Sequence, residues 1–395
     1  MALTVLLTGG RAAVTLELAR MWSRAGHRVV MAETIGWHLS RYSNVIAAHH
    51  RLPWPTTDHP AFVDALERII EQERVDLFLP TCEELFHVAR ARARLSQRCA
   101  LPISDIDLLH DLHHKSRFVD RARAAGLAAP TGALAQTTDA LRAMLQRALD
   151  TQEPVALKPV YSRFAAYTIC RPRRLEEIDD VEVTADNPWL VQRFIDGRAL
   201  CTWGFARQGR LLAHVTYPSR YTLGTAATVV YQPLDHPGAE RWAKTFIAHT
   251  NFTGPIGFDL IEAPNGEVFG IECNPRLTGG LHLLAHQPAL LDVILGESRP
   301  VVRPDGAPSA MLAVSMVLFL LSKVRTTADF TQWLHTFRAS REVVHDRRDP
   351  IPAMWRYVWL AGILLRAHRM QIPSATAAGM DMEWNGERSD ADRHF

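Results

Sequence analysis

Two runs of sequence decide the fold of this chain: Gly257-Phe258-Asp259-Leu260-Ile261 and, beyond an Asn265-Gly266 turn, Gly270-Ile271-Glu272-Cys273-Asn274-Pro275-Arg276. An Asn-Gly pair between apolar runs is a strong signal for a β-hairpin. Because side chains two residues apart on a strand share a face, Glu272 and Asn274 project together. Asp259 lies on the other predicted strand, so two carboxylates and one amide oxygen can converge. Acids on an otherwise apolar hairpin are costly unless they are paired or bind a ligand.

Oxygen ligands of this kind suit Mg²⁺, which keeps some waters and takes further ligands from phosphate. Arg276, two residues beyond Asn274, supplies a fixed cation beside such an ion. Pro275 ends the strand pairing there, since it cannot donate a hydrogen bond. The alternative interpretation is an ordinary hairpin whose acids are solvated.

Lysine is rare in this chain. Of 44 basic residues only four are lysines, namely Lys115, Lys158, Lys244 and Lys323. A lysine in such an arginine-rich sequence raises the question of whether a compact ammonium was needed where a planar guanidinium would not fit. For any single lysine, chance is the simpler alternative.

The first part of the chain alternates predicted strands with helices, which indicates a doubly wound parallel sheet. We predict strands at 3–8, 27–32 and 75–80, and helices at 12–24 and 58–74, the second capped by Asp58. Gly9-Gly10 follows the first strand as in a dinucleotide fingerprint, but the third glycine is missing.

The second part is richer in antiparallel strands. A helix at 111–126 carries Lys115, and helix 238–250 comes before the hairpin of the opening motif. We predict strands at 154–159, 164–170 and 189–195, then a hairpin of 199–207 with 211–217.

After residue 300 two apolar runs, 311–322 and 354–365, fall short of the ~18–20 residues that span a bilayer. We interpret them as buried helices; a membrane contact, a helical lid and a pocket for a long-chain acid or amine are the alternatives. Residues 380–385 are expected to dock as a strand.

The ordered pair Phe-Asp-Leu-Ile and Ile-Glu-Cys-Asn-Pro-Arg resembles the metal-binding signature of ATP-grasp enzymes, among them biotin carboxylase, carbamoyl phosphate synthetase and amino-acid ligases. The resemblance implies that Asp259, Glu272 and Asn274 bind Mg²⁺, with Mn²⁺ as a substitute, and that Arg276 contacts the acyl phosphate or substrate. It covers roughly residues 1–295.

The resemblance implies a Rossmann-like leading domain and an ATP-grasp domain made of a small α+β subdomain and an antiparallel catalytic subdomain. The chain beyond them is expected to form a mainly helical C-terminal extension. Their expected bounds are 1–112, 113–300 (113–196 and 197–300) and 301–395.

Lys115 and Lys158 stand where the family has two lysines that reach the ATP phosphates, and residues 189–197 resemble its adenine hinge. The backbone of Arg193 and Ile195 would then meet the adenine edge. The residues expected to bind the nucleotide are Lys115, Lys158, Ser162, Arg163, Gln192, Arg193, Phe194, Ile195 and Asp196.

The chain also departs from the family. The loop after Lys158 has no glycine whose amide could wrap a phosphate, so Ser162 and Arg163 are expected to compensate. Arg220 is expected to bind phosphate or carboxylate, with a solvated loop arginine as the alternative. His282 is the histidine expected to face the substrate.

The resemblance implies an ATP-dependent ligase that joins a small-molecule carboxylate to an amine or related nucleophile through an acyl phosphate, releasing ADP and phosphate. Two alternatives stay open: phosphorylation of bicarbonate or a small acid, as in carbamoyl phosphate synthetase, and a nucleotide-binding scaffold without turnover. A net charge of +2 gives no signal for a nucleic-acid partner. Five isolated cysteines and the absence of a signal-peptide pattern favour the cytoplasm, and a homodimer is left open.

Overall fold

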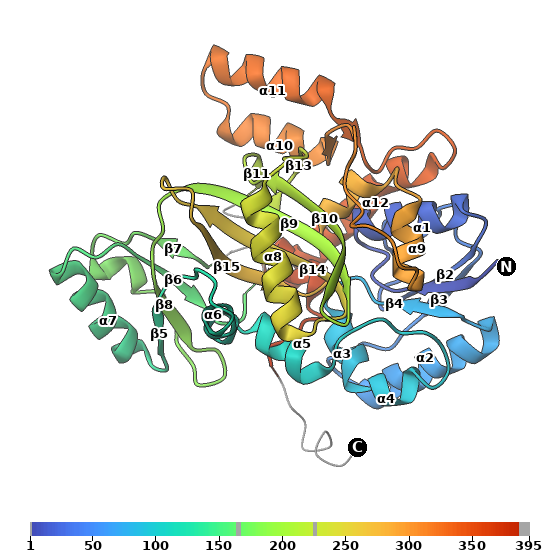
Figure 1. Ribbon diagram of the computed structural model, residues 1–395, viewed down its shortest axis with the longest axis horizontal. Helices are drawn as coiled ribbons and strands as arrows, with labels where there is room; N and C mark the ends of the chain where they lie inside the picture. Colours follow the sequence, from blue (N-terminus) through green and yellow to red (C-terminus); the bar gives the residue numbers. More distant parts are fainter. Residues whose placement is uncertain (1, 163–166, 224–226, 387–395) are drawn as a thin grey trace.

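A four-stranded parallel sheet opens the chain, and its strands lie in the order β3-β2-β1-β4 (Figure 1). The computed structural model describes residues 2–162, 167–223 and 227–386. The first strands and helices are β1 (Thr4–Leu7), α1 (Ala13–Arg24), β2 (Arg28–Glu33), β3 (Ala48–Arg51), α2 (His59–Glu73) and β4 (Leu77–Leu79). These elements confirm the predicted alternation, and Asp58 caps α2 by accepting from the Ala61 N–H at 2.9 Å.

The two faces of this sheet are covered by different helices, because alternate side chains of a buried strand point to opposite sides. Leu7 of β1 packs in one cluster with Leu16 of α1, whereas Leu6 packs in the other with Phe62 of α2. Each strand therefore reads as a continuous apolar run, as expected for a doubly covered parallel sheet.

A second, antiparallel sheet runs in the order β10-β9-β14-β15. Its strands are β9 (Arg198–Arg207), β10 (Arg210–Pro218), β14 (Gly254–Glu262) and β15 (Val268–Asn274). Gln208 and Gly209 join β9 to β10, and both have positive φ, as a two-residue hairpin turn requires. Helix α8 (Pro237–Thr250) packs on this sheet, with the Phe246 ring against Phe258 at 5.3 Å between centroids.

A third sheet, in the order β5-β8-β6-β7, projects to one side of the molecule (Figure 1). Its strands are β5 (Gly132–Ala135), β6 (Val155–Pro159), β7 (Ile169–Cys170) and β8 (Trp189–Arg193). Leu157 and Val191 pack with α7 (Thr138–Asp150) on one face. Lys158 is one residue further along β6, so its side chain leaves from the opposite face, together with Gln192.

The helix predicted at 111–126 is two helices, α5 (Ile106–His113) and α6 (Lys115–Ala124). His114 separates them in an extended conformation, and its ring accepts the Arg117 N–H at 3.3 Å as the N-cap of α6. Lys115 is consequently the first residue of α6. Helices α3 (Glu84–Arg90), α4 (Arg92–Leu95) and α9 (Ala289–Leu295) were not predicted.

The two apolar runs after residue 300 do form helices, but the prediction that they are buried is wrong. They correspond to α10 (Ala313–Lys323) and α12 (Ile351–Met370). Helix α11 (Thr327–Ala339) lies with α10 at the top of Figure 1, and α13 (Ser374–Gly379) follows α12. Met316 is the one buried residue of α10, and α12 buries only Pro352 and Ala367. No helix in the described ranges is both long and apolar enough to cross a membrane.

Residues 380–385 dock against the first sheet, although not as the predicted strand. The Asp381 carboxylate accepts two hydrogen bonds from the Arg11 guanidinium, at 2.7 and 2.9 Å, and the Trp384 ring stacks on Phe86. Both Asp381 and Trp384 are buried, so this segment is an integral part of the core.

A buried ion pair ties α1 to the segment before α12. Arg20 donates to the Asp349 carboxylate at 2.9 Å and to the carbonyls of Val343 and Val344, while Ser43 also donates to Asp349. Asp349→Ala leaves the Arg20 charge buried without its counterion, and we expect a loss of about 3–5 kcal/mol in the free energy of unfolding, measured by urea denaturation.

The matched control is Asp346→Ala, three residues away, whose ion pair with Arg24 is partly exposed. It should cost about 1 kcal/mol or less. Equal losses in the two variants would contradict the special role of the buried pair.

Candidate active site

The ribbon of β14 and β15 brings the three predicted oxygen ligands together. Asp259 lies directly opposite Glu272 and Gly257 opposite Asn274, so the side chains of Asp259, Glu272 and Asn274 share one face. The Asn274 amide donates to the Asp259 carboxylate at 3.4 Å. The pairing shifts by one residue immediately after Asp259, which leaves Ile271 as a bulge. Bulges of this kind re-aim neighbouring side chains.

The charge of Glu272 perturbs the facing carboxylate of Asp259. Burial, and then the negative charge of Glu272, raise the pKa of Asp259 to about 6, while Cys201, Arg276 and Lys158 act in the opposite direction. Asp259 and Glu272 on one face of the ribbon form an acidic surface that can bind a cation.

Lys115 reaches the same ribbon from the first turn of α6. Its ammonium donates to the Val160 carbonyl and to the Ser162 hydroxyl, both at 3.2 Å, and lies 3.9 Å from a Glu272 carboxylate oxygen. The lysine is only 2% exposed. The structure thus brings together Lys115, Ser162 and Glu272, as the sequence predicts.

Lys158 approaches from the open face of the third sheet. Burial lowers the pKa of its ammonium to about 8; the charges of Glu272 and Asp259 oppose this shift and that of Lys115 adds to it. Within residues 2–162, 167–223 and 227–386, this ammonium makes no hydrogen bond or ion pair. Gln192 on the same face is buried, and its amide nitrogen also lacks a partner in those ranges. A buried amide donor without an acceptor, on the same sheet face as a buried lysine, indicates room for an anionic or polar ligand.

Some backbone groups of the segment predicted as an adenine hinge already form hydrogen bonds within the protein. The Arg193 N–H donates to the Thr131 carbonyl at 2.8 Å and the Phe194 N–H to that of Pro154 at 2.8 Å. Asp196 is exposed and pairs with Arg171, whose guanidinium also lies 4.4 Å from the centre of the Phe194 ring. Ile195 is buried beside them. Among the described residues, the Arg193 carbonyl and the Ile195 N–H make no backbone hydrogen bond outside the sheet pairing, and Asp196 pairs with Arg171.

The predicted arginines differ in their placement. Arg276 donates to the Asn274 side-chain oxygen at 3.2 Å, so it belongs to the cluster. Arg220 is exposed in the loop after β10 and lies over the neighbouring Tyr221 ring. Arg163 lies outside the described residues.

His282 does not face the cluster, contrary to the prediction. It is buried, and its ring nitrogen lies 3.1 Å from a Glu17 carboxylate oxygen that also accepts from Arg341. The histidine therefore belongs to an ion pair between α1 and the C-terminal part of the chain.

Cys201 is a member of the site that sequence reasoning missed. It lies on β9 directly opposite Asp259, and its thiol donates to the Asp259 carboxylate at 3.1 Å. Burial and the Asp259 charge raise the pKa of this thiol well above its usual value, which keeps the proton available for donation. Thr228 and Ser219 continue the chain of hydroxyl contacts from the thiol. The pairing of β9 with β14 brings Cys201 to Asp259. These two strands are far apart in the sequence, so a local sequence pattern does not predict the contact.

The donor set fits a hard divalent cation. The described residues contain no group of three or more histidine, cysteine, aspartate or glutamate side chains placed to hold a metal. Two carboxylates and one amide oxygen are nevertheless the partial set that Mg²⁺ uses when phosphate and water complete its shell.

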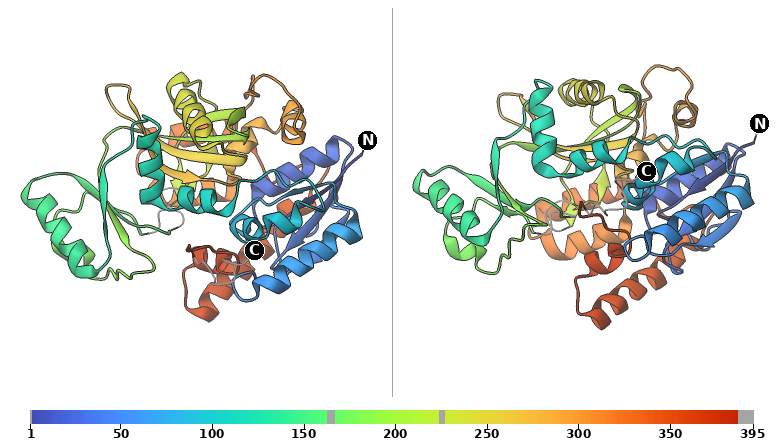
Figure 2. Two further views of the ribbon diagram at one scale, coloured as in Figure 1. Left: turned by 60° about the horizontal axis from the view of Figure 1, so that its bottom comes forward. Right: turned by 90° about the horizontal axis from the view of Figure 1, so that it is seen from below.

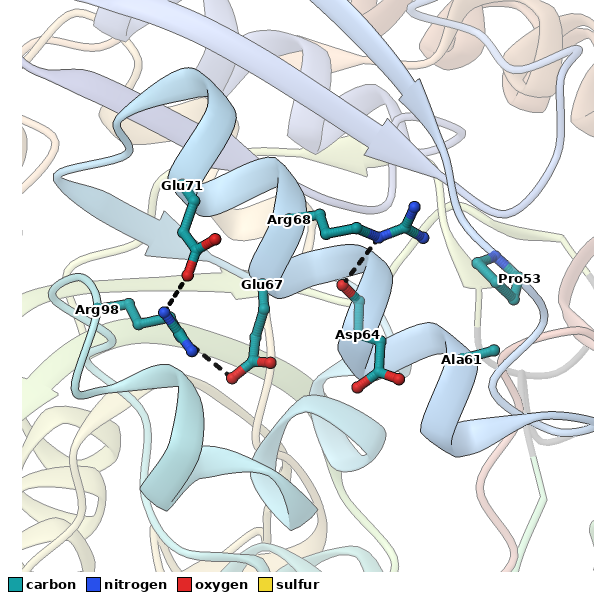
Figure 3. Close-up of a pocket in the computed structure, with 7 residues that line it drawn as sticks. All are labelled: Pro53, Ala61, Asp64, Glu67, Arg68, Glu71 and Arg98. Carbon is teal, nitrogen blue, oxygen red and sulfur yellow. Dashed lines mark hydrogen bonds and ion pairs between the residues drawn. The ribbon is translucent and has the colours of Figure 1, made fainter.

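A depression on α2 is not a competing site (Figure 3). Its charged side chains already pair with one another, Arg98 with Glu67 and Glu71, and Arg68 with the Asp64 carbonyl. Because these exposed charges are already paired, the depression provides few free charged groups to bind a ligand.

The raised pKa of Asp259 predicts a pH-dependent cost to the metal-free fold. Its folded pKa of about 6 exceeds the unfolded value of 3.8, so the stabilising contribution is complete below pH 3.8 and is lost as the pH rises through about 6. In EDTA, Asp259→Asn should gain about 1–2 kcal/mol relative to the wild type between pH 5 and pH 8.

Urea denaturation across that pH range provides the measurement. The exposed turn variant Glu267→Gln is the control and should change the free energy of unfolding by less than about 0.5 kcal/mol. A difference between Asp259→Asn and the wild type that is constant with pH would contradict the carboxylate repulsion.

Comparison with known proteins identifies the fold. No protein-family profile matches the sequence, and a search of curated proteins finds no relative. An L-amino acid ligase from Bacillus licheniformis superimposes with a TM-score of 0.58 at 15% identity, over 74% of each chain. A biotin carboxylase from Campylobacter jejuni gives 0.59 at 13% identity, over 75% of this chain and 72% of that one.

A carboxyaminoimidazole synthase from Aspergillus clavatus, solved with ADP and 5-aminoimidazole ribonucleotide, covers more of the molecule. It gives 0.59 at 12% identity, over 81% of this chain and 87% of that one. Identities this low establish a shared architecture of mixed parallel and antiparallel sheets, and by that architecture the protein has the fold of the ATP-grasp ligases.

Proposed function

We propose that this protein is an ATP-dependent ligase that activates a small-molecule carboxylate as an acyl phosphate and transfers it to an amine. The observation that carries the proposal is the convergence of two buried ammonium groups, Lys115 and Lys158, on the acidic face of one β-ribbon. The solved structures with this fold include ligases bound to ADP and to magnesium ADP.

Each residue has a place in that reaction. Asp259, Glu272 and Asn274 would hold Mg²⁺, or Mn²⁺ in its place, and the ion supplies charge neutralisation on the phosphates when bound. Lys115 and Lys158 orient the triphosphate as point charges. The Arg193 carbonyl and the Ile195 N–H would form hydrogen bonds with the edge of the adenine. The Gln192 amide would donate to the nucleotide from the sheet face, and the Phe194 ring would pack against the base.

The chemistry balances in two steps. A carboxylate oxygen of the acid attacks the γ-phosphorus of ATP, the bond from that phosphorus to the β–γ bridging oxygen breaks, and ADP leaves. The amine then attacks the acyl carbon, the bond to the phosphate oxygen breaks, and phosphate leaves as the amine gives up a proton. Arg276, fixed by Asn274, is placed to stabilise the charge of the acyl phosphate.

We further propose the division 1–112, 113–300 and 301–395, with a Rossmann-like leading domain. The parallel sheet β3-β2-β1-β4 supports the first boundary, and the change to exposed helices supports the last. Arg220 directly follows Ser219, whose hydroxyl contacts Thr228, and we propose that Arg220 binds the acid from this loop.

The ribbon predicts which variants lose activity. Purified protein should release ADP and phosphate with at least one acid–amine pair in a screen, and Asp259→Ala and Glu272→Ala should each lower that rate on the order of 100-fold or more. The control Glu267→Gln removes a carboxylate from the same ribbon at its exposed turn and should leave the rate unchanged. Full activity in both alanine variants would rule out the metal site.

The low pKa of Lys158 predicts how nucleotide affinity changes with pH. The free ammonium is protonated below its pKa of about 8 and loses its charge above it, whereas bound phosphate favours the charged form. Binding of magnesium ADP should therefore weaken about tenfold from pH 7 to pH 9 and take up a proton at the higher pH.

Titration calorimetry in two buffers of different ionisation enthalpy measures both quantities. Lys158→Met should bind weakly and without this pH dependence, while Lys244→Met, on the exposed side of α8, should behave as the wild type. An unchanged pH profile in Lys158→Met would assign the titration to another group.

A further inference from the structure

Helix α12 exposes apolar side chains along its length. It lies at the outer edge of the molecule in both views of Figure 2. Met354 is 76% exposed and Leu364 60% exposed. The large exposed side chains of α12, here called the α12 surface together with the neighbouring Trp37 and Tyr42, are Ile351, Met354, Tyr357, Val358, Leu364, Leu365 and Met370. Exposure of this many contiguous large side chains marks an interaction site on a soluble domain.

The spacing makes these residues one stripe. Ile351, Met354, Val358, Ala361 and Leu365 follow one another at intervals of three and four, which places them on one face over about 20 Å of helix. Aromatic rings border the stripe. Tyr42 packs edge-on against Trp355 at 4.6 Å between centroids, and the exposed Trp37 lies beside Gly362.

The charges around the stripe are positive. Between residues 341 and 370 each of the three carboxylates has an arginine partner: Glu342 pairs with Arg356, Asp346 with Arg24 and Asp349 with Arg20. The arginines of this segment that make no ion pair within the described ranges are Arg347, Arg348, Arg366 and Arg369. Arg366 stacks on the Trp54 ring at 4.9 Å, so the basic rim consists of Arg347, Arg348 and Arg369. The helix itself contains no acid.

The apolar stripe and the arginines around it together indicate which kind of partner binds the α12 surface. A second copy of the chain would set arginine rims against each other, and like charges across an interface are costly. An apolar stripe with an aromatic border and a basic rim is complementary to anionic headgroups above an acyl layer. We propose that α12 docks this protein on an anionic membrane surface, with the helix lying in the plane of the headgroups and not crossing the bilayer.

Vesicle flotation with the full chain tests the proposal. The probes are vesicles of phosphatidylcholine alone and of phosphatidylcholine with phosphatidylglycerol in a ratio of about three to one. The wild type should float with the mixed vesicles only, and raising the salt from about 0.1 M to about 0.5 M should weaken this binding.

Variants locate the contact. Met354→Glu and Leu364→Glu should each lower the fraction bound at least about tenfold, because each places a charge where an apolar side chain enters the membrane. Leu295→Glu makes the same change at an exposed leucine of α9 and should bind as the wild type. Arg347→Gln with Arg348→Gln should also reduce binding, and unchanged thermal unfolding confirms that all the variants fold.

Three results would overturn the proposal: no flotation with the mixed vesicles, equal flotation with phosphatidylcholine alone, or an equal loss in Leu295→Glu. Light scattering without lipid tests the alternative partner, a second copy of the chain. A wild-type dimer that Met354→Glu converts to a monomer, with no vesicle binding, would assign the α12 surface to a second copy of the chain.

Discussion

The site depends on one electrostatic constraint: two carboxylates and two ammonium groups are held close together in a place where few other groups neutralise them. The backbone pairing of β14 with β15 fixes Asp259 opposite Glu272, and α6 fixes Lys115 within 3.9 Å of Glu272. A slip of one residue in that pairing would turn every side chain of one strand to the other face. The strand register therefore holds together charges that would move apart in the unfolded chain. This arrangement lowers the stability of the fold, and a bound cation and anion can restore it.

Sequence reasoning succeeded where the signal is local. The Asn265-Gly266 turn and the alternation of β15 were enough to predict that Glu272 and Asn274 share a face with Asp259. It failed where partners are distant or where burial is the question. The thiol of Cys201 meets Asp259 only because β9 pairs with β14, and an apolar run such as that of α12 reads the same on a surface as in a core.

The hinge segment shows what a motif leaves undetermined. The order of residues in 192–196 suggested which groups meet a nucleotide, but not which hydrogen bonds those groups already make. The Arg193 N–H is used by Thr131, and Asp196 turns to Arg171, whose φ of +52° places its backbone in the left-handed region. A family resemblance thus predicts which segment borders the site more reliably than it predicts which backbone and side-chain groups form hydrogen bonds with the ligand.

The C-terminal segment binds the arginine that follows the glycine pair after β1. The carboxyl ends of parallel strands are where ligands usually bind such a sheet. Here the Arg11 guanidinium that follows Gly9-Gly10 is held between Glu33, at the end of β2, and Asp381, at 2.6 and 2.7 Å. The same segment continues to Trp384, whose carbonyl lies 3.2 Å from the ring of His113, two residues before Lys115. The docking of residues 380–385 on the first sheet and the placement of Lys115 are consequently parts of one packed unit.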